Sequence, residues 1–366
     1  MPNAASHKDV ETVAIVGLGL IGGSIAKALK QTDAPPRLLG YDLEETLRAA
    51  ARDGAIDEAI GSIEDAAEAD AIFLCLPADA SLEAMRTLAP IMRKGSVLTD
   101  VCGVKSRPEN VWATVGDPDA YVGGHPMTGK ERGGYDNSDP LLFENAVYIL
   151  SSRAKNSPRA PVVVSLVERL GARVKFLDPD FHDRVVANLS HMPQLLSVAL
   201  MNGVAANDED GAMLDFAGGG FRDMTRIASS DFDVWEPIVR LNKSEILRAF
   251  GILRDELDEV ERMIVEDRFE ALSDRFESAR RKRDEIPKNA KGFLKPLHDI
   301  YVFVKDRPGV LHKITHVLAE RGVNIKDIEL LKFREGAGGT FRLSFDDKRD
   351  ADIAAELIRD AGFATK

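Results

Sequence analysis

The stretch that decides the fold is Val13-Ala-Ile-Val-Gly17-Leu-Gly19-Leu-Ile-Gly22-Gly-Ser-Ile-Ala-Lys-Ala-Leu29. Its apolar, mostly β-branched start predicts a buried parallel strand, and the apolar residues after the glycines repeat at helical spacing. Gly17 permits a tight turn, Gly19 lets the backbone approach a pyrophosphate, and Gly22 allows close helix–strand packing. The stretch therefore predicts a strand–turn–helix unit that binds a dinucleotide.

Two further features favour this interpretation. Leu20 and Ile21 open the helix, where free N–H groups and the positive end of the helix dipole face the phosphates. A second strand, Arg37-Leu-Leu-Gly-Tyr-Asp42, ends in an acid twenty residues past the third glycine of the motif. Asp42 is placed to accept from ribose hydroxyls and would repel a 2′-phosphate, which predicts NAD rather than NADP. The alternative is that Asp42 only caps the next helix. Asp100, at the end of a later strand, is a further cofactor-binding candidate.

Composition narrows the class of protein. The chain has 366 residues, 44% of them hydrophobic and 30% charged, which is typical of a soluble globular protein of two or three domains. A net charge of −12 argues against a nucleic-acid partner. Its two cysteines, Cys75 and Cys102, cannot form a disulfide framework. We find no signal peptide and no apolar run long enough to cross a membrane, so we expect a cytoplasmic protein with no membrane partner.

Three domains follow from the change of period along the chain. Residues 11–177 alternate strands and helices, as a doubly wound Rossmann-type α/β sheet requires. Residues 178–285 show helical periodicity alone, and residues 286–296 have the composition of a linker. Residues 297–366 follow a βαββα pattern, with room for only a short last strand or none, which predicts a small α+β domain. In the first domain, later strands are expected at 71–77, 95–100, 121–124, 146–150 and 173–176.

One helix of the second domain carries a long apolar stripe. Its residues are spaced by threes and fours: Ile246, Phe250, Leu253, Leu257, Val260 and Ile264. The stripe could pack against a second subunit, and we expect a homodimer. Packing within one chain accounts for the stripe equally well.

The stretch Gly123-Gly-His125-Pro-Met-Thr-Gly129-Lys-Glu-Arg132 follows a strand of the sheet, so its polar groups face the ligand crevice. Histidine is the side chain best suited to take a proton near neutral pH, which makes His125 the candidate general base. Lys130 and Arg132 are cations that could bind an anionic substrate in an otherwise acidic chain. The alternatives are a structural histidine and solvated surface charges.

Two stretches of the helical domain add polar groups. Asn188-Leu-Ser190-His191-Met-Pro-Gln194 predicts an amphipathic helix that its proline kinks, with Ser190 and Gln194 on one face. Gly218-Gly-Gly-Phe-Arg222-Asp223-Met-Thr225-Arg226 places two arginines after a glycine turn, and Arg226 is the candidate for binding a carboxylate. The plainer interpretations are a bent core helix and an ion pair with Asp223.

Other chemistry finds little support in the sequence. His312 and His316 have a metal-ligand spacing in the third domain, but no cysteine or acid joins them in the motif, and we predict no metal site. The chain has neither a nucleophile-elbow motif nor a Walker motif, so hydrolase and nucleoside-triphosphatase functions are not indicated.

Five ordered motifs within residues 11–285 together resemble the prephenate dehydrogenase family. They are Gly17–Ser24, Asp100-Val-Cys-Gly-Val-Lys105, Gly124-His-Pro-Met-Thr-Gly129, Leu189-Ser-His-Met-Pro193 and Gly220-Phe-Arg-Asp-Met-Thr-Arg-Ile-Ala228. Residues 298–366 resemble an ACT domain, an amino-acid-sensing βαββαβ module, through Val304-Lys-Asp-Arg-Pro-Gly-Val-Leu311 and Gly322-Val-Asn-Ile325.

The resemblance implies the oxidative decarboxylation of prephenate by NAD, which gives 4-hydroxyphenylpyruvate, CO2 and NADH in tyrosine biosynthesis. His125 would bind the ring 4-hydroxyl and take its proton. Arg226 matches an arginine that holds a substrate carboxylate, and Ser190 matches a serine that lines the histidine and the nicotinamide.

Three positions depart from the family pattern. Many relatives carry a serine where Gly103 stands, a second histidine where Gln194 stands, and a threonine or serine where Lys130 stands. Lys130 and Gln194 lie where the substrate side chain should be recognised. They leave open whether the substrate is prephenate or arogenate, which differ by a ketone against an ammonium.

The ACT resemblance implies feedback control, with tyrosine as the expected effector. ACT modules bind their ligand between paired copies, near the turn after the first strand and the loop before the second. In this chain Gly309, Val310 and Asn324 are the candidate effector contacts. The alternative is a module that serves only dimerisation.

Two rival functions are also compatible with the sequence. The first is another Rossmann and helical dehydrogenase acting on a β-hydroxy acid, for which Lys243 is the one candidate base. The second is a regulator that senses NAD and an amino acid without turnover, for which the His125 crevice would have no use.

Overall fold

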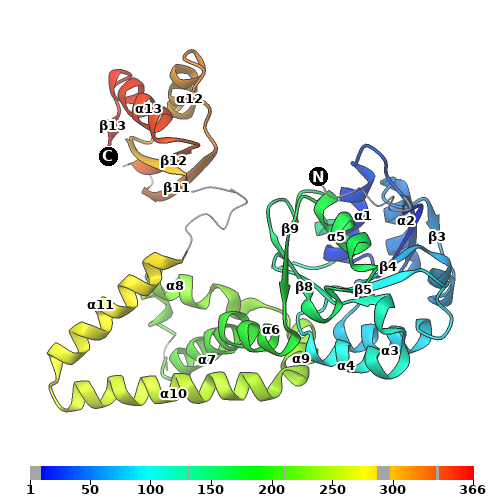
Figure 1. Ribbon diagram of the computed structural model, residues 1–366. Coiled ribbons are helices and arrows are strands. Elements are labelled where there is room, and N and C mark those ends of the chain that lie inside the picture. Colours follow the sequence, from blue (N-terminus) through cyan, green and yellow to red (C-terminus); the bar gives the residue numbers. More distant parts are fainter. Residues whose placement is uncertain (1–9, 131, 209–210, 287–296, 335–337) are drawn as a thin grey trace. The chain divides into compact units, whose positions relative to one another are not determined.

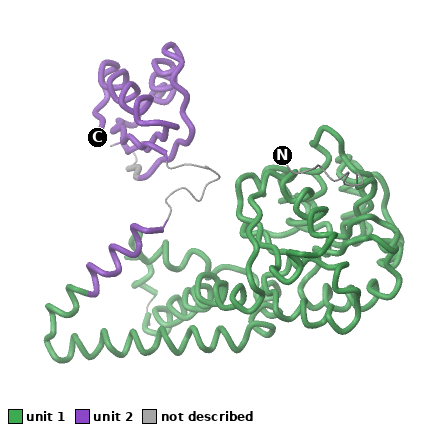
Figure 2. Tube along the Cα trace, in the orientation of Figure 1, with its two compact units in different colours: residues 1–274 green, residues 275–366 purple. Residues whose placement is uncertain are grey.

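The computed structural model describes residues 10–130, 132–208, 211–286, 297–334 and 338–366. The chain forms two compact units, residues 1–274 and residues 275–366 (Figure 2). The division falls within α11 (Phe269–Glu285). Nearly all of the linker predicted at 286–296 lies outside the described residues.

The first unit contains a six-stranded parallel sheet, as predicted (Figure 1). Its order is β3-β2-β1-β4-β5-β6, so the chain reverses its direction of winding between β1 and β4. Ligands bind at such a switch point, outside the carboxyl ends of the strands. The strands are β1 (Thr12–Val16), β2 (Arg37–Tyr41), β3 (Glu58–Ala59), β4 (Ala71–Leu74), β5 (Val97–Asp100) and β6 (Tyr121–Val122).

Alternation along β1 builds a core on each face of this sheet. Val13 and Ile15 point into one apolar cluster, and Ala14 and Val16 point into the other, because successive side chains of a strand face opposite sides. Helices cover both faces, so the central strand β4 is apolar and buried along its whole length. These helices are α1 (Leu20–Lys30), α2 (Glu44–Arg52), α3 (Ala78–Leu88), α4 (Ser106–Val115) and α5 (Ala160–Arg169).

The later strands differ from the prediction, which placed them all in one sheet. β6 ends at Val122, and β7 (Gly124–Pro126), β8 (Val147–Ser151) and β9 (Arg173–Leu177) form a second sheet in the order β7-β8-β9. β7 pairs antiparallel with β8, and β8 pairs parallel with β9. The chain can bend here because Gly124 has no side chain. A Cβ at this position would lie 2.6 Å from the Asp100 carbonyl oxygen, which is too close. His125 therefore lies on a strand rather than in the loop after one.

The rest of this unit is helical, as predicted. α6 begins after Asp178, whose side chain accepts from the amides of Asp180 and Phe181, with Pro179 at its first position. The α-helices are α6 (Pro179–Val186), α7 (Met192–Ala206), α8 (Gly219–Thr225), α9 (Phe232–Leu241) and α10 (Lys243–Val265). Between α6 and α7 the chain forms a π-helical turn, Ala187–His191, where a proline kink was predicted. Pro193 has no N–H to donate to the preceding turn, which favours such a widening.

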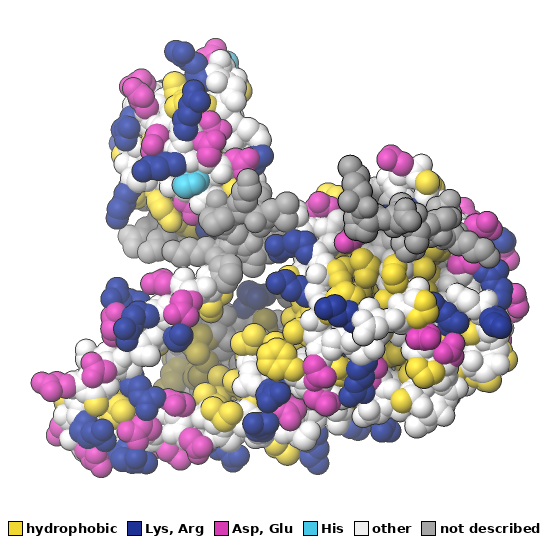
Figure 3. Space-filling view, viewed as in Figure 1, with side chains coloured by type: hydrophobic (Ala, Val, Ile, Leu, Met, Phe, Trp, Pro, Cys, Tyr) yellow, Lys and Arg dark blue, Asp and Glu magenta, His cyan; other side chains and the backbone are white. Residues whose placement is uncertain are grey.

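The apolar stripe of α10 is buried only at its start. Ile246 is 3% exposed, whereas Leu257 is 55% and Ile264 is 53% exposed. Figure 3 shows apolar, acidic and basic side chains intermixed on the visible face of this helical region. Packing within the described chain therefore leaves the second half of the stripe uncovered.

The second unit contains the predicted βαββαβ domain. β10 (His298–Val304), α12 (Val310–Ala319), β11 (Asp327–Arg334), β12 (Gly338–Phe345), α13 (Lys348–Asp360) and β13 (Ala364–Thr365) follow in order. The sheet order is β11-β12-β10-β13, and both helices contribute to its own apolar core. The last strand is short, as expected, with two residues paired to β10.

The two histidines on α12 have an acid within reach, contrary to the sequence interpretation. The rings of His312 and His316 stack with centroids 5.5 Å apart, and His316 Nε2 lies 3.3 Å from Glu320 Oε1. Among the described residues, no three His, Cys, Asp or Glu side chains are grouped so as to hold a metal ion. Nor does any helix in the described part of the chain have the length and apolarity to span a membrane.

Both cysteines are free, and Cys75 lies beside the glycine turn. Cys102 is buried, and the side chain of Cys75 would lie 3.0 Å from a Cβ at Gly22. Burial raises the pKa of both thiols well above the ordinary value. The thiol of Cys102 is therefore unreactive in the folded protein, whereas Cys75 is half-buried.

Candidate active site

The glycine motif forms the turn that the sequence predicts. Gly17 has φ +97°, and a Cβ there would lie 2.7 Å from the Cys75 carbonyl oxygen. A Cβ at Gly22 would lie 1.8 Å from the Gly17 carbonyl oxygen, so only glycine allows this approach of helix to strand. A Cβ at Gly19 would meet nothing within 4 Å. The open space at Gly19 is where a pyrophosphate would approach the backbone.

The N-terminus of α1 is chemically suited to an anion. Gly19 is its N-cap, Leu20 and Ile21 are its first residues, and no side chain caps it. Its first turn contains no acid. The free backbone N–H groups of this turn therefore remain to bind phosphate oxygens.

Asp42 is held at the edge of the same turn. Its carboxylate accepts from the amide of Leu18 at 2.6 Å and from the amide of Leu43 at 2.6 Å. It does not cap α2, whose N-cap is Leu43 and which has no side-chain cap bond. The capping alternative is therefore wrong, and the carboxylate is fixed beside the glycine turn.

Asp100 has a different setting. Its side chain is fully buried, and it accepts from Lys105 Nζ at 2.5 Å, Tyr121 Oη at 2.7 Å, and the amides of Cys102 at 3.0 Å and Gly124 at 3.1 Å. Lys105 Nζ also donates to the Gly124 carbonyl oxygen at 2.6 Å. This buried ion pair ties β5 to β7. Four donors occupy this carboxylate, which supports the site from behind, and its contact with the cofactor stays a prediction.

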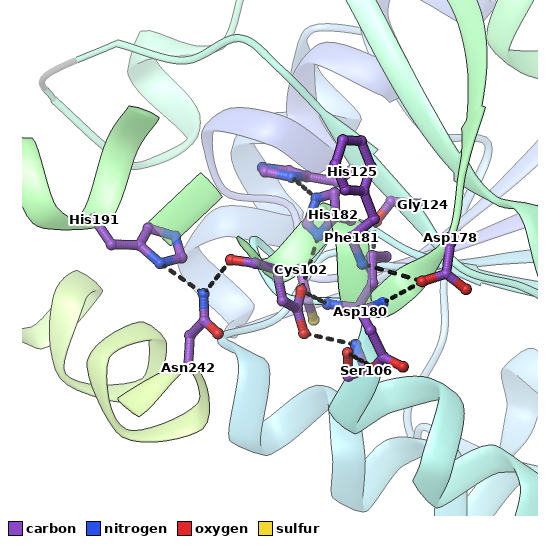
Figure 4. A network of polar contacts seen from close by, with 12 residues as sticks. Cys102, Ser106, Gly124, His125, Asp178, Asp180, Phe181, His182, His191 and Asn242 are labelled. Carbon is purple, nitrogen blue, oxygen red and sulfur yellow. Dashed lines mark hydrogen bonds and ion pairs between the residues drawn. The ribbon is translucent and has the colours of Figure 1, made fainter. Parts of the chain in front are cut away.

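His125 is the first member of a chain of three polar side chains (Figure 4). His125 Nδ1 lies 2.8 Å from His182 Nε2, and His182 Nδ1 lies 2.8 Å from Asp183 Oδ1. The amides of Lys105 and Ser106 donate to the Asp183 carboxylate at 2.6 and 2.9 Å. The chain joins β7 to the N-terminal half of α6.

This chain fixes which nitrogen of His125 is basic. The Asp183 carboxylate can only accept, so His182 Nδ1 carries a hydrogen and His182 Nε2 is left as an acceptor. His125 Nδ1 must then donate to His182, which leaves the lone pair of His125 on Nε2. The Nε2 atom points to the side of Gly103, where a Cβ would lie 3.9 Å from it.

The protonation states agree with this geometry. Burial, followed by the neighbouring His182, Lys105 and His191, lowers the pKa of His125 well below its usual value, so the imidazole is neutral at pH 7. Burial alone would raise the pKa of Asp183, but hydrogen bonds from His182 and from two amides bring it below its ordinary value. A neutral base is thus backed by an ionised carboxylate.

His182 and Asp183 were missed by the sequence reasoning. Their signal was the stretch Asp178-Pro-Asp-Phe-His-Asp183, which caps a helix directly after β9. A helix that begins beyond the carboxyl end of a strand brings its first residues to the crevice.

The helical domain supplies the other predicted groups. Ser190 is half-buried in the π-helical turn, whereas Gln194 is buried and donates from Nε2 to the Ile227 carbonyl oxygen at 2.7 Å. Arg226 is exposed at the start of the 3₁₀ turn that contains Ile227. Gln194 thus anchors the turn that carries Arg226.

The remaining candidates lie apart from this network. Lys130 Nζ lies 3.1 Å from Asp139 Oδ2 and donates to the Asn137 carbonyl oxygen at 3.1 Å. Arg132 is exposed, and so is Lys243 at the first residue of α10. Lys243 therefore lies outside the buried network around His125. This weakens the alternative function, a β-hydroxy-acid dehydrogenase that would need Lys243 as its base.

Comparison with known proteins covers all three domains. Residues 25–176 match the family described as prephenate dehydrogenase, nucleotide-binding domain, and residues 178–278 match prephenate dehydrogenase, dimerization domain. Residues 298–363 match the ACT domain.

Individual relatives agree with these matches. The prephenate dehydrogenase of Bacillus subtilis is 34% identical over 355 residues, covering 95% of each chain. That of Lactococcus lactis is 31% identical, covering 96% of this chain and 98% of the relative. A crystal structure of prephenate dehydrogenase from A. aeolicus, in complex with hydroxyphenyl propionate and NAD+, has 30% identity and a TM-score of 0.71. It covers 78% of this chain and 100% of the A. aeolicus chain. Synechocystis arogenate dehydrogenase has 28% identity and a TM-score of 0.65, covering 75% of this chain and 99% of its own.

Proposed function

This chain belongs to the prephenate dehydrogenase family of NAD-dependent oxidoreductases, and on that premise we propose that it converts prephenate to 4-hydroxyphenylpyruvate and CO2 with His125 as the general base. The observation that carries the proposal is the His125–His182–Asp183 chain, which leaves a neutral imidazole with its Nε2 lone pair facing the crevice. A sensor without turnover would have no need of such a base.

The protein's own groups manage one proton. His125 Nε2 accepts the proton of the ring 4-hydroxyl, and Asp183 acts through His182 to orient the His125 ring with its lone pair on Nε2. NAD, when bound, would supply the hydride acceptor for C4. The ring carboxylate leaves as CO2, and its bonding electrons restore aromaticity. His125 returns this proton to the ring oxygen as the ring becomes aromatic, so prephenate and NAD+ give 4-hydroxyphenylpyruvate, CO2 and NADH with no net release of a proton.

The glycine turn and α1 fit the cofactor. The backbone at Gly17, Gly19 and Gly22 and the first N–H groups of α1, at Leu20 and Ile21, would hold the pyrophosphate. The fixed carboxylate of Asp42 would accept from the adenosine ribose hydroxyls, which favours NAD over NADP.

Substrate recognition is assigned to the helical side and to Lys130. Arg226 would bind a carboxylate of prephenate, and Ser190 would line the space between His125 and the nicotinamide. Lys130 and Gln194 would lie near the pyruvyl side chain. An ammonium at Lys130 attracts the ketone oxygen of prephenate and repels the ammonium of arogenate, which favours prephenate.

The assay that tests this function follows NADH absorbance with prephenate and arogenate side by side. We expect prephenate to be the better substrate and His125→Asn to lower kcat by roughly 10²–10⁴-fold, with NAD binding little changed. Preference for arogenate would refute the substrate assignment. A His125→Asn enzyme that keeps most of its kcat would refute the base.

Assembly and control extend the proposal. We propose a cytoplasmic homodimer that pairs through the uncovered second half of the α10 stripe, where Leu257 and Ile264 are more than half exposed. Tyrosine would bind at the ACT domain. Gly309 has φ +83° and caps α12, Val310 opens that helix, and Asn324 is exposed before β11. Free backbone groups and an amide there suit the charged ends of an amino acid.

A further inference from the structure

The segment Tyr135–Asp139 packs against the helix that would bind the dinucleotide. A Cβ at Gly23 of α1 would lie 2.8 Å from Tyr135 Cδ2 and 2.9 Å from Ser138 Cβ. The helix therefore needs glycine at this position to admit the segment. The contact joins parts of the chain that lie more than one hundred residues apart.

Ser24 forms the hydrogen bond at the centre of this contact. Its side chain is fully buried, and its Oγ donates to the Leu20 carbonyl oxygen at 2.6 Å. The same Oγ accepts from the Asp139 amide at 2.8 Å. A single buried hydroxyl thus links the first turn of α1 to the backbone of Asp139.

Tyr135 provides a second attachment. Its ring is 7% exposed and lies under Lys27 Nζ, 4.4 Å from the ring centroid. Its hydroxyl donates to Asp53 Oδ2 at 3.1 Å, and Lys27 Nζ lies 3.6 Å from the same carboxylate oxygen. The segment is therefore fixed to α1 and to the end of α2.

Asp139 connects this segment to Lys130 through an ion pair. Its Oδ2 lies 3.1 Å from Lys130 Nζ, and its Oδ1 accepts from the Leu141 amide at 2.9 Å. Lys130 also donates to the Asn137 carbonyl oxygen, within the same segment. Asn137 and Asp139, the two partners of Lys130 among the described residues, therefore belong to the segment that Ser24 attaches.

We propose that Ser24 is a positioning residue for substrate recognition: it holds Asp139 on α1, and Asp139 holds the Lys130 ammonium. This rests on the proposed role of Lys130 in binding the substrate side chain. The helix that binds the dinucleotide then also sets the place of a substrate-binding charge. A purely structural serine would lower stability without a specific effect on prephenate.

A double-mutant cycle with Ser24→Ala and Lys130→Met tests the proposal. We expect each variant to raise the KM for prephenate by about 3–10-fold, the worth of one hydrogen bond or exposed charge contact. The kcat and the KM for NAD should stay within about twofold, and the double variant should be no worse than Lys130→Met alone, because both changes remove one interaction. Asp139→Asn, which keeps the amide donor to Ser24 but loses the charge, should match Lys130→Met.

Ser157→Ala is the matched control. Ser157 is also a buried serine whose Oγ donates to a carbonyl, that of Asp119, and accepts from an amide, that of Arg159. It should leave the KM for prephenate unchanged at a comparable loss of thermal stability. If Lys130→Met raises the KM but Ser24→Ala and Asp139→Asn do not, or if the effects add, the positioning role is refuted while the proposed function stands. If Lys130→Met has no effect, the substrate role of Lys130 itself is refuted.

Discussion

At the scale of single residues, His125 links structure to the pH dependence of activity. Its pKa lies below the usual 6.5 because burial and nearby cationic or imidazole groups disfavour the imidazolium. Protonated His125 cannot accept the substrate proton, so kcat/KM should fall as pH decreases through that pKa, at a pH below 6.5. A pH profile of kcat/KM measures this. An acid limb centred at pH 7 or above would contradict the structure.

His182 explains why the pH profile should depend on a second residue. His182→Asn removes the ring between His125 and Asp183 but leaves His125 in place, so it should lower kcat and move the acid limb. The pairing of the two rings could not be read from the sequence, because His182 lies 57 residues from His125 and only the fold brings them together. The motif around His125 predicted the base but not what orients it.

Gly103 offers a direct test of the open space beside His125. A Cβ there would meet nothing nearer than 3.8 Å, at Ile238, so serine fits without strain. We expect Gly103→Ser to fold normally and to change kcat/KM for prephenate by at least about threefold, through a new hydroxyl near Nε2. Gly103→Ala separates the hydroxyl from the added bulk. Equal kinetics for the serine and alanine variants would show that the hydroxyl makes no contact.

At the scale of secondary structure, the sequence predicted element types better than it predicted their pairing. The glycine turn, the parallel sheet and the long α10 were all predicted from local pattern. The division into two sheets was not, because it depends on β6 ending at Val122 and on the buried Asp100–Lys105 pair that receives Gly124. The π-helical turn was predicted only as a kink, since Pro193 indicates a broken hydrogen bond but not how the chain accommodates it.

The junction of the π-helical turn with α10 should make stability depend on pH. His191 is 2% exposed, lies 3.1 Å from Asn242 Nδ2, and has a pKa of about 4, chiefly because burial disfavours the charged ring. The unfolded chain therefore binds the proton first as pH falls. This contribution to stability is complete above pH 6.5 and is lost as pH falls toward 4.

His191→Asn removes the titration and keeps an amide beside Asn242. Between pH 7 and pH 5, wild-type protein should lose about 2 kcal/mol more of its free energy of unfolding than the variant does. Urea unfolding of both proteins at the two pH values measures the difference. Parallel losses in the two proteins would mean that His191 does not titrate on unfolding.

At the scale of the whole molecule, the ACT domain should separate regulation from catalysis. Its sheet and core are complete within residues 298–365, and the catalytic groups all lie in the other unit. A chain ending at residue 288 should keep its kcat with prephenate and lose inhibition by tyrosine, because effector coupling requires the binding site. Inhibition curves for the full and shortened proteins test this. Identical inhibition curves for the two proteins would mean that tyrosine does not act through the ACT domain.

The buried Cys102 makes the dinucleotide domain a reporter of its own opening. Cys75 is half-buried, so a Cys75→Ser variant leaves Cys102 as the single thiol of the chain, and a sulfhydryl reagent can label Cys102 only when this domain opens. The rate of labelling then measures local unfolding of this domain and does not depend on unfolding of the helical or ACT domains. NAD that binds the closed form lowers the labelling rate by a factor set by the NAD concentration relative to its Kd. Cofactor affinity thereby becomes measurable in the absence of turnover, even in variants that no longer react.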